Sequence, residues 1–366
     1  MTNSNSDFLD IYVTRIALKV APAVVCIVFC SGDKEIAWGS GFLIECDAVD
    51  GKFQTTVMTS ATFLRVDGNL IDDLKVIVVL SDGEECDADV EAFDFHYNLA
   101  AIKVHVDHSV EIARLRHVDD FLMIDPGNSS TREATTFQLR RHSDLFQLYP
   151  GTKVIALGRC HNEPNYLMSY LGEFSIEQCR FDCKELMRST CTIPKCGIGG
   201  PLVNRSGEVI GINFFSSEFT PSLPINIVSK WWGHYKKFGD YRRPWLGLEL
   251  RNLYSATIDN LEKITRNFPD IRKGIIIDEV TQDSPAHSAG VHPDDIIVEC
   301  DGQIVQSSLQ FFDITWDKVG KMVELVVLRG DRSRVKSSIM VDIISPNQFN
   351  SWPLKRPRPD WSKMFS

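Results

Sequence analysis

The sequence predicts a mostly β protein with two folded domains and a short tail. Its 366 residues exceed the usual size of one domain, and 43% hydrophobic against 24% charged residues is typical of a globular chain with a buried core. Short alternating or β-branched runs recur along the first part of the chain, with Asp67-Gly68 and Asp82-Gly83 as turn residues. A polar boundary at residues 239–244 precedes the second domain.

The predicted strands of the first domain fall into two groups separated by a polar stretch at residues 125–131. Each group consists of runs short enough for antiparallel pairing through tight turns. Residues 223–228 resemble the last strand of a known family of such domains, which implies a closing helix at 228–238. The other predicted strands are 24–30, 38–45, 53–59, 74–80 and 85–93 in the first group, and 153–157, 167–174 and 208–214 in the second.

Three motifs give this domain a family resemblance. Residues 197–203 read Gly-Ile-Gly-Gly-Pro-Leu-Val, residues 39–42 read Gly-Ser-Gly-Phe, and residues 98–104 read Asn-Leu-Ala-Ala-Ile-Lys-Val. In their sequence and in their order along the chain, they resemble the motifs of the trypsin-like serine proteases of the HtrA/Deg family. The resemblance implies a trypsin-like double β-barrel with an active site between the barrels.

The positions that match the family's catalytic triad hold other residues. Ile198 stands where the motif has its nucleophilic serine, Thr62 where it has histidine, and Asn98 where it has aspartate. Isoleucine cannot attack a carbonyl, threonine is no base at neutral pH, and asparagine carries no charge. The resemblance also implies an oxyanion pocket formed by the backbone N–H groups of Cys196 and Ile198. We therefore expect a non-proteolytic homologue, a pseudoprotease.

The alternative is an active serine-type endopeptidase whose catalytic residues have moved. Cys196 is the most credible displaced nucleophile, because thiolates are intrinsically reactive. His96 is the nearest histidine in sequence to a catalytic motif, two positions before Asn98. Otherwise Cys196 is expected to be structural and His96 to lie on a surface loop.

The second domain resembles the PDZ domain of HtrA proteins. The match runs through residues 245–250, 274–280 and 284–303, with Pro293-Asp294-Asp295 where the family usually has Pro-Gly-Asp. Leu246, Gly247 and Leu248 match the loop whose backbone N–H groups receive a peptide's terminal carboxylate, while the peptide adds as an extra strand. The other interpretation is that Gly247 serves a turn and the domain packs permanently on the barrels.

The expected domains are a protease-like domain at 1–239, a PDZ domain at 244–345 and a proline-rich, basic tail at 346–366. The resemblance implies polypeptides or protein C-termini as ligands, in a regulatory or scaffolding role, and homo- or hetero-oligomers with HtrA/Deg-like proteins. Within the tail, residues 355–358 read Lys-Arg-Pro-Arg, which is similar to a short nuclear-import signal.

Composition narrows the remaining classes. The net charge of −10 disfavours nucleic-acid binding, and no apolar run is long enough to span a bilayer. The polar start lacks the features of a signal peptide, so we expect a cytoplasmic or nuclear protein with ten free cysteines. Cys179 and Cys183 form no close pair of the kind typical of zinc sites, and neither a metal nor a cofactor is expected.

Overall fold

The computed structural model describes residues 4–343 except 50, 67–68, 125–144, 162–165, 178, 180, 182 and 241, and the side chains of residues 4–10 are also outside the description. The polar stretch predicted at 125–131 and the tail at 346–366 therefore lie outside the described residues. Within them, no helix is both long and apolar enough to cross a membrane.

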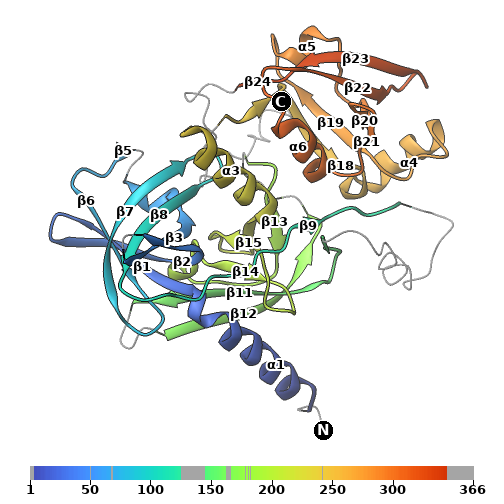
Figure 1. Ribbon diagram of the computed structural model, residues 1–366. Helices are drawn as coiled ribbons and strands as arrows, with labels where there is room; N and C mark the ends of the chain where they lie inside the picture. The colour runs from blue at the N-terminus through green and yellow to red at the C-terminus, as the bar shows by residue number, and fades with distance from the viewer. Residues whose placement is uncertain are drawn as a thin grey trace, which may run out of the picture.

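The first part of the chain forms a closed antiparallel barrel (Figure 1). Its strand order is β1-β2-β3-β8-β7-β6, and neighbours along the chain pair through short turns. Seven of the eight residues of β1 are buried, because this strand packs against the second barrel as well as inside its own. The strands are β1 (Val24–Ser31), β2 (Lys34–Val49), β3 (Lys52–Ser60), β6 (Leu74–Val79), β7 (Glu85–Asp94) and β8 (Leu99–Val106).

A second closed barrel follows, with strand order β11-β12-β13-β16-β15-β14. The two barrels share one continuous hydrophobic core. This arrangement confirms the predicted mostly β double barrel. The strands are β11 (Lys153–Cys160), β12 (Tyr166–Ser175), β13 (Met187–Ser189), β14 (Pro201–Val203), β15 (Val209–Asn213) and β16 (Thr220–Pro224).

Two helices flank the barrels. Helix α1 (Ser4–Val20) lies against the second barrel (Figure 1), where Lys19 donates a 2.8 Å hydrogen bond to the carbonyl of Ser206. Helix α3 (Ile225–Phe238) begins directly after β16. The prediction of a strand through residue 228 was wrong, because the buried residues Ile225, Val228, Trp231 and Trp232 follow helical spacing.

The PDZ domain has a five-strand path β18-β19-β20-β22-β23, with β21 paired to β20. Strand β18 is at the edge of this sheet. The elements are β18 (Leu248–Asn252), α4 (Ile258–Asn267), β19 (Ile275–Val280), α5 (Pro285–Ser288), β20 (Ile296–Cys300), β21 (Gln303–Ile304), α6 (Ser308–Trp316), β22 (Met322–Leu328) and β23 (Arg334–Met340).

The remaining elements are short. They comprise the strand pairs β4 (Arg65–Val66) with β5 (Asn69–Leu70), β9 (Val118–Asp119) with β10 (Phe146–Gln147), and β17 (Pro244–Trp245) with β24 (Asp342–Ile343), and the 3₁₀ turns η1 (Ala21–Ala23), η2 (Ala61–Leu64), η4 (Lys195–Gly197) and η5 (Leu253–Ser255).

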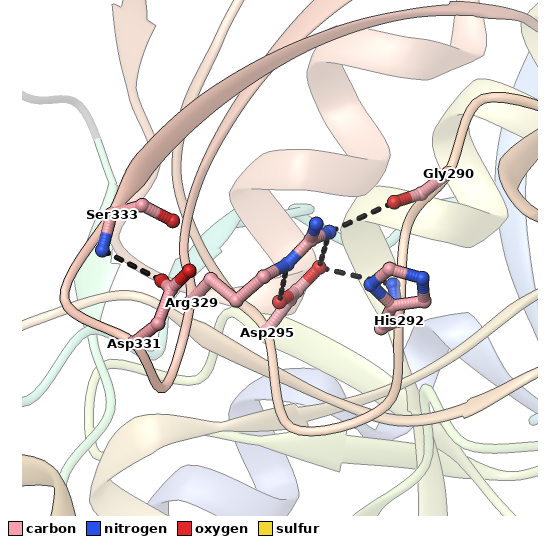
Figure 2. Close-up of polar contacts among 6 residues, drawn as sticks. All are labelled: Gly290, His292, Asp295, Arg329, Asp331 and Ser333. Atoms are coloured by element: carbon pink, nitrogen blue, oxygen red, sulfur yellow. Dashed lines mark hydrogen bonds and ion pairs between the residues drawn. The ribbon is translucent and has the colours of Figure 1, made fainter.

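The turn that departs from the family's Pro-Gly-Asp pattern keeps its shape. Asp294 takes the left-handed conformation, with φ at 66°, that glycine would adopt freely. The next residue, Asp295, is buried and receives two hydrogen bonds from Arg329, at 2.9 and 2.7 Å (Figure 2). Arg329 also donates to the carbonyl of Gly290, so this bidentate pair ties the turn to β22.

Helix α6 connects the PDZ domain to the barrels. Phe311 on this helix packs in the PDZ core, whereas Phe312 and Trp316 belong to the core of the barrels. The ring of Tyr97, in the turn between β7 and β8, lies edge-on to Phe312 at 6.3 Å and tilted to Trp316 at 6.4 Å. One helix therefore contributes side chains to two hydrophobic cores.

Candidate functional site

The structure brings the three triad-matching positions together around one cavity of about 820 Å³, which we call the inter-barrel cavity. Thr62 lies in η2, Asn98 in the turn before β8, and Ile198 directly after η4. These segments come from both barrels, as the predicted fold requires. The rest of the wall is largely aromatic or contains sulfur, and includes Trp38, Tyr166, Met168, Tyr170, Phe214 and Phe215.

Thr62 and Asn98 form a neutral polar pair. The Thr62 hydroxyl lies 2.8 Å from the Asn98 amide nitrogen and 3.0 Å from its amide oxygen. The same oxygen accepts a 3.0 Å hydrogen bond from the hydroxyl of Ser60. Neither an amide nor an aliphatic hydroxyl takes up a proton near neutral pH. The pair therefore has a fixed geometry but cannot serve as a general base.

Ile198 presents an apolar side chain where the motif has its nucleophile. Its own backbone N–H donates to the carbonyl of Lys195 at 3.2 Å, closing the 3₁₀ turn η4. One of the two expected oxyanion donors is thus engaged within the chain in this conformation. A developing oxyanion needs donors that are already aimed at its position, so this turn would have to rearrange to receive one.

The Gly-Ser-Gly-Phe motif holds the two barrels in register at this cavity. The Ser40 hydroxyl donates to the carbonyl of Cys196 at 2.6 Å and accepts from the backbone N–H of Arg159 at 2.8 Å. The Ser40 N–H donates to the carbonyl of Ile198 at 2.8 Å. On Gly39, an added Cβ would lie 2.3 Å from the Phe63 ring, so no larger residue fits there. In this structure the motif therefore serves the packing of the two barrels against each other.

Two cysteines meet on the wall of the inter-barrel cavity. Cys160 Sγ lies 2.8 Å from Cys196 Sγ, although the residues come from β11 and η4. Burial and the contact with Cys160 raise the pKa of the Cys196 thiol to about 12. At neutral pH Cys196 is therefore protonated, which makes it a poor nucleophile.

His96, the candidate base for a cysteine dyad, lies elsewhere. No histidine lines the inter-barrel cavity among the described residues. The expectation that His96 lies on a surface loop was wrong, because its exposed fraction is 8%. It faces a second cavity, where His96, Cys183 and Glu185 form a cluster of potential metal ligands. The exposed residues Asp82, Glu84 and His108 form another such cluster.

The second cavity, of about 290 Å³, lies between β18 and α6, and we call it the PDZ groove. Leu246, Gly247 and Leu248 all line it, as predicted for a peptide-binding loop. Gly247 has φ at 78°, and an added Cβ would lie 2.1 Å from the Cβ of Ser284. Only glycine fits this position without moving its neighbours.

The barrels form one wall of the PDZ groove. His96, Tyr97 and Glu185 line it from the barrel side, and Lys184 pairs with Glu249 of β18 at 3.5 Å. Beneath Tyr97, burial lowers the pKa of Arg243 to about 10, and its guanidinium lies beside the buried carboxyl of Asp94.

The far end of β18 is also tied to the barrels. The Asp120 carboxylate accepts from Asn252 at 3.2 Å and from the Tyr254 hydroxyl at 3.0 Å. The amide oxygen of Asn252 in turn accepts a 2.6 Å hydrogen bond from the backbone N–H of Ser308, at the start of α6. These contacts hold the end of β18 against the barrels, about one short strand away from Gly247.

Comparisons with known proteins agree with this architecture. Residues 39–212 match the model of the trypsin-like peptidase domain, and residues 244–337 match that of the PDZ domain. The chain is HtrA/Deg-like. This HtrA/Deg-like chain keeps both domains in the order that its motifs predict.

Named relatives share the resemblance over most of this chain. It is 28% identical over 351 residues to the Arabidopsis thaliana protein named Putative protease Do-like 14, covering 92% of this chain and 72% of that one. It is 23% identical over 317 residues to human Serine protease HTRA3, covering 81% of this chain and 62% of that protein. The chain thus spans less than two thirds of the length of HTRA3.

Solved structures show the same fold. The HtrA-type protease AlgW with tripeptide has a TM-score of 0.59 at 19% identity, covering 91% of this chain and 97% of that one. The serine endoprotease from Yersinia pestis has a TM-score of 0.51 at 18% identity, covering 90% of this chain and 98% of that one.

The contacts between the barrels and the PDZ domain could not be predicted from the sequence. Tyr97 lies in a barrel turn and Asp120 follows β9, and nothing in their local sequence indicates a partner in the second domain. The adjacent residues Phe311 and Phe312 are the sequence feature that could have indicated these contacts. Adjacent aromatic residues on one helix point to two different faces, which indicates two packing partners.

Proposed function

We propose that this protein is an HtrA/Deg-like pseudoprotease that binds polypeptides or protein C-termini in its PDZ groove and acts as a regulatory or scaffolding subunit. The observation that carries the proposal is the trio of Thr62, Asn98 and Ile198 at the inter-barrel cavity, since none of these three side chains is a base or a nucleophile. Self-association with HtrA/Deg-like proteins is part of the proposal through resemblance alone.

The expected rate of proteolysis follows from the replacement of all three catalytic groups. Triad members act as a unit, so removing one of the key groups costs about as much as removing all of them. The oxyanion hole and substrate binding alone give a rate enhancement of roughly 10³–10⁴ over the uncatalysed reaction. Here one oxyanion donor, the N–H of Ile198, is also engaged with Lys195.

Peptide binding is supported by three features of the PDZ groove. Strand β18 is an edge strand, so its outer backbone groups are available to a strand that adds beside it. Gly247 keeps the left-handed conformation that lets a carboxylate approach the backbone. The groove has space for a short C-terminal segment, and its walls include the apolar residues Leu248 and Phe311.

The absence of proteolysis is tested with purified full-length protein, unfolded casein and a fluorophosphonate probe. We expect no cleavage and no labelling from the wild type or from Ile198→Ser alone, because a serine without a base remains protonated. The triple variant Thr62→His, Asn98→Asp, Ile198→Ser is the positive control, with trace labelling expected. Casein cleavage by the wild type that persists after rigorous repurification would overturn the proposal in favour of an endopeptidase with relocated residues, and its loss in Cys196→Ala or His96→Ala would identify those residues.

Peptide binding is tested by calorimetry on the full-length protein, with peptides that end in an apolar residue. Amidation removes the terminal charge, and a hydrogen bond to a charged group contributes about 1.5–3 kcal/mol. We expect amidated peptides to bind roughly 10–100-fold more weakly than the free acids. Equal affinity for both forms would discard the carboxylate-loop assignment and favour a PDZ domain that serves only as a packing module.

A further inference from the structure

Three side chains with different ligand atoms meet where the two barrels face the PDZ groove. His96 comes from the turn between β7 and β8, and Cys183 and Glu185 come from the segment between β12 and β13. One ring nitrogen, one sulfur and one carboxylate oxygen all lie within 4.8 Å of one another. Cys183 Sγ lies 3.4 Å from Glu185 Oε2.

The environment of this cluster is acidic and largely buried. Cys183 is 1% exposed and His96 is buried, while Glu185 is partly buried at the groove wall. Burial raises the pKa of Cys183 well above its ordinary value, and the charges of Glu185 and Asp94 raise it further. Burial likewise raises the pKa of Glu185. A cation at the centre would reverse this balance, since a bound metal deprotonates a coordinating thiol.

We propose that His96, Cys183 and Glu185 form a binding site for a divalent transition-metal ion, Zn²⁺ by the chemistry of its ligands. The fourth position opens on the PDZ groove, from which a water molecule can complete a tetrahedral shell. The site has an entry path, because His96 and Glu185 line that groove.

The ligand set selects the metal. Imidazole nitrogen, thiolate sulfur and carboxylate oxygen are the donors that zinc accepts together, at about 2.0–2.3 Å. Tetrahedral geometry at those bond lengths separates ligand atoms by roughly 3.3–3.8 Å. The three ligand atoms lie within 4.8 Å of one another, so the side chains must approach by at most about 1.5 Å. Coordination exchanges the thiol proton for the metal: Zn²⁺ binds the sulfur, and one H⁺ is released to solvent.

The position of the site gives the metal a structural role. His96 lies two residues before Asn98 and next to Tyr97, whose ring contacts Phe312 and Trp316 of α6. Cys183 and Glu185 flank Lys184, which pairs with Glu249 of the PDZ domain. A bound ion would therefore fix both barrel segments that form the wall of the PDZ groove.

The test is a titration of chelator-stripped full-length protein, kept reduced, with Co²⁺ and then Zn²⁺. We expect one equivalent of Co²⁺ to produce a thiolate-to-cobalt charge-transfer band, which Zn²⁺ then removes. Proton release should accompany binding. Cys183→Ser should abolish the band, and His96→Gln and Glu185→Gln should each weaken binding at least about tenfold.

Matched controls separate this site from the other thiols and ligands. Cys179→Ser alters a buried cysteine of the same segment, Cys160→Ser alters the thiol pair at the inter-barrel cavity, and His108→Gln alters the exposed cluster. All three should leave the band and the affinity unchanged. Circular dichroism checks folding, and if Cys183→Ser does not fold, His96→Gln and Glu185→Gln decide the outcome.

Two results would overturn the proposal. One is a wild-type protein that gives no thiolate-to-cobalt band at stoichiometric metal. The other is a band that persists in Cys183→Ser, or unweakened metal binding in both His96→Gln and Glu185→Gln; its loss in Cys160→Ser would then assign the metal to the thiol pair at the inter-barrel cavity.

Discussion

The inter-barrel cavity and the PDZ groove differ in how their residues relate to the motifs that they match. At the cavity, Ser40 connects the two barrels, but Thr62, Asn98 and Ile198 offer no proton acceptor or nucleophile. At the PDZ groove, Gly247 has the left-handed conformation that the proposed carboxylate loop requires, and it lies beside an edge strand. The difference shows that the packing of a site does not depend on its ionisable groups, because packing residues also stabilise the core.

Trp316→Ala tests whether the cavity and the groove belong to structurally independent regions. It has the largest expected effect on stability of the substitutions considered. Trp316 is 2% exposed in the barrel core although it belongs to the PDZ helix α6. Its loss should lower the free energy of unfolding by about 3–5 kcal/mol. Urea denaturation measures the change. Ile258→Ala, at an 86% exposed helical position, is the control and should stay within about 0.5 kcal/mol.

Gly247→Val should break the groove and leave the cavity unchanged. The new Cβ would collide with Ser284 and force a β-branched residue into the left-handed region. We expect peptide affinity to fall at least about tenfold, as measured by calorimetry. Gly302→Val is the matched control, since Gly302 has φ at 73° but no atoms within 4 Å of an added Cβ. Equal loss of affinity in both variants would indicate general destabilisation.

Asp120→Asn changes the carboxyl that binds the end of β18, and it has the smallest expected effect on stability. Burial raises the pKa of the Asp120 carboxyl above its ordinary value. As the pH rises above about 4, the unfolded chain loses this proton first, so the carboxyl's contribution to stability falls until the raised pKa is passed. Asparagine does not titrate. The stability of the variant relative to the wild type should therefore increase with pH across that window.

Denaturation at a series of pH values from about 4 to 7 would measure this trend. If the difference in unfolding free energy between Asp120→Asn and the wild type did not change with pH, the Asp120 carboxyl would not be desolvated in solution.

Sequence predicts those parts of this molecule that depend on local pattern. Turn residues and alternating runs located the barrel strands, and the glycine motifs placed Thr62, Asn98 and Ile198 around one cavity. Contacts between distant segments could not be predicted in this way. His96 has the sequence context of a loop, and it is buried because α6 of the other domain packs over the neighbouring Tyr97.

The strand predicted at residues 223–228 failed for a related reason. Ile225 and Val228 are apolar and β-branched, which favours a strand, yet Trp231 and Trp232 complete a helical face that only the barrels can bury. Cys160 and Cys196 meet because β11 ends at η4, a juxtaposition created by barrel closure.

The two-sided helix α6 limits how this PDZ domain can be exchanged. Each residue along an α-helix turns by about 100°, so one residue inserted in the helix before Phe311 would turn Phe311 toward the barrels and Phe312 away from their core. A PDZ domain transplanted from a relative would meet the same mismatch unless its helix carried large side chains at the positions of Phe312 and Trp316. The second domain is therefore not freely exchangeable. Recombination at the linker would disrupt the packing of α6 against the barrels, although the motifs on either side suggest two separable domains.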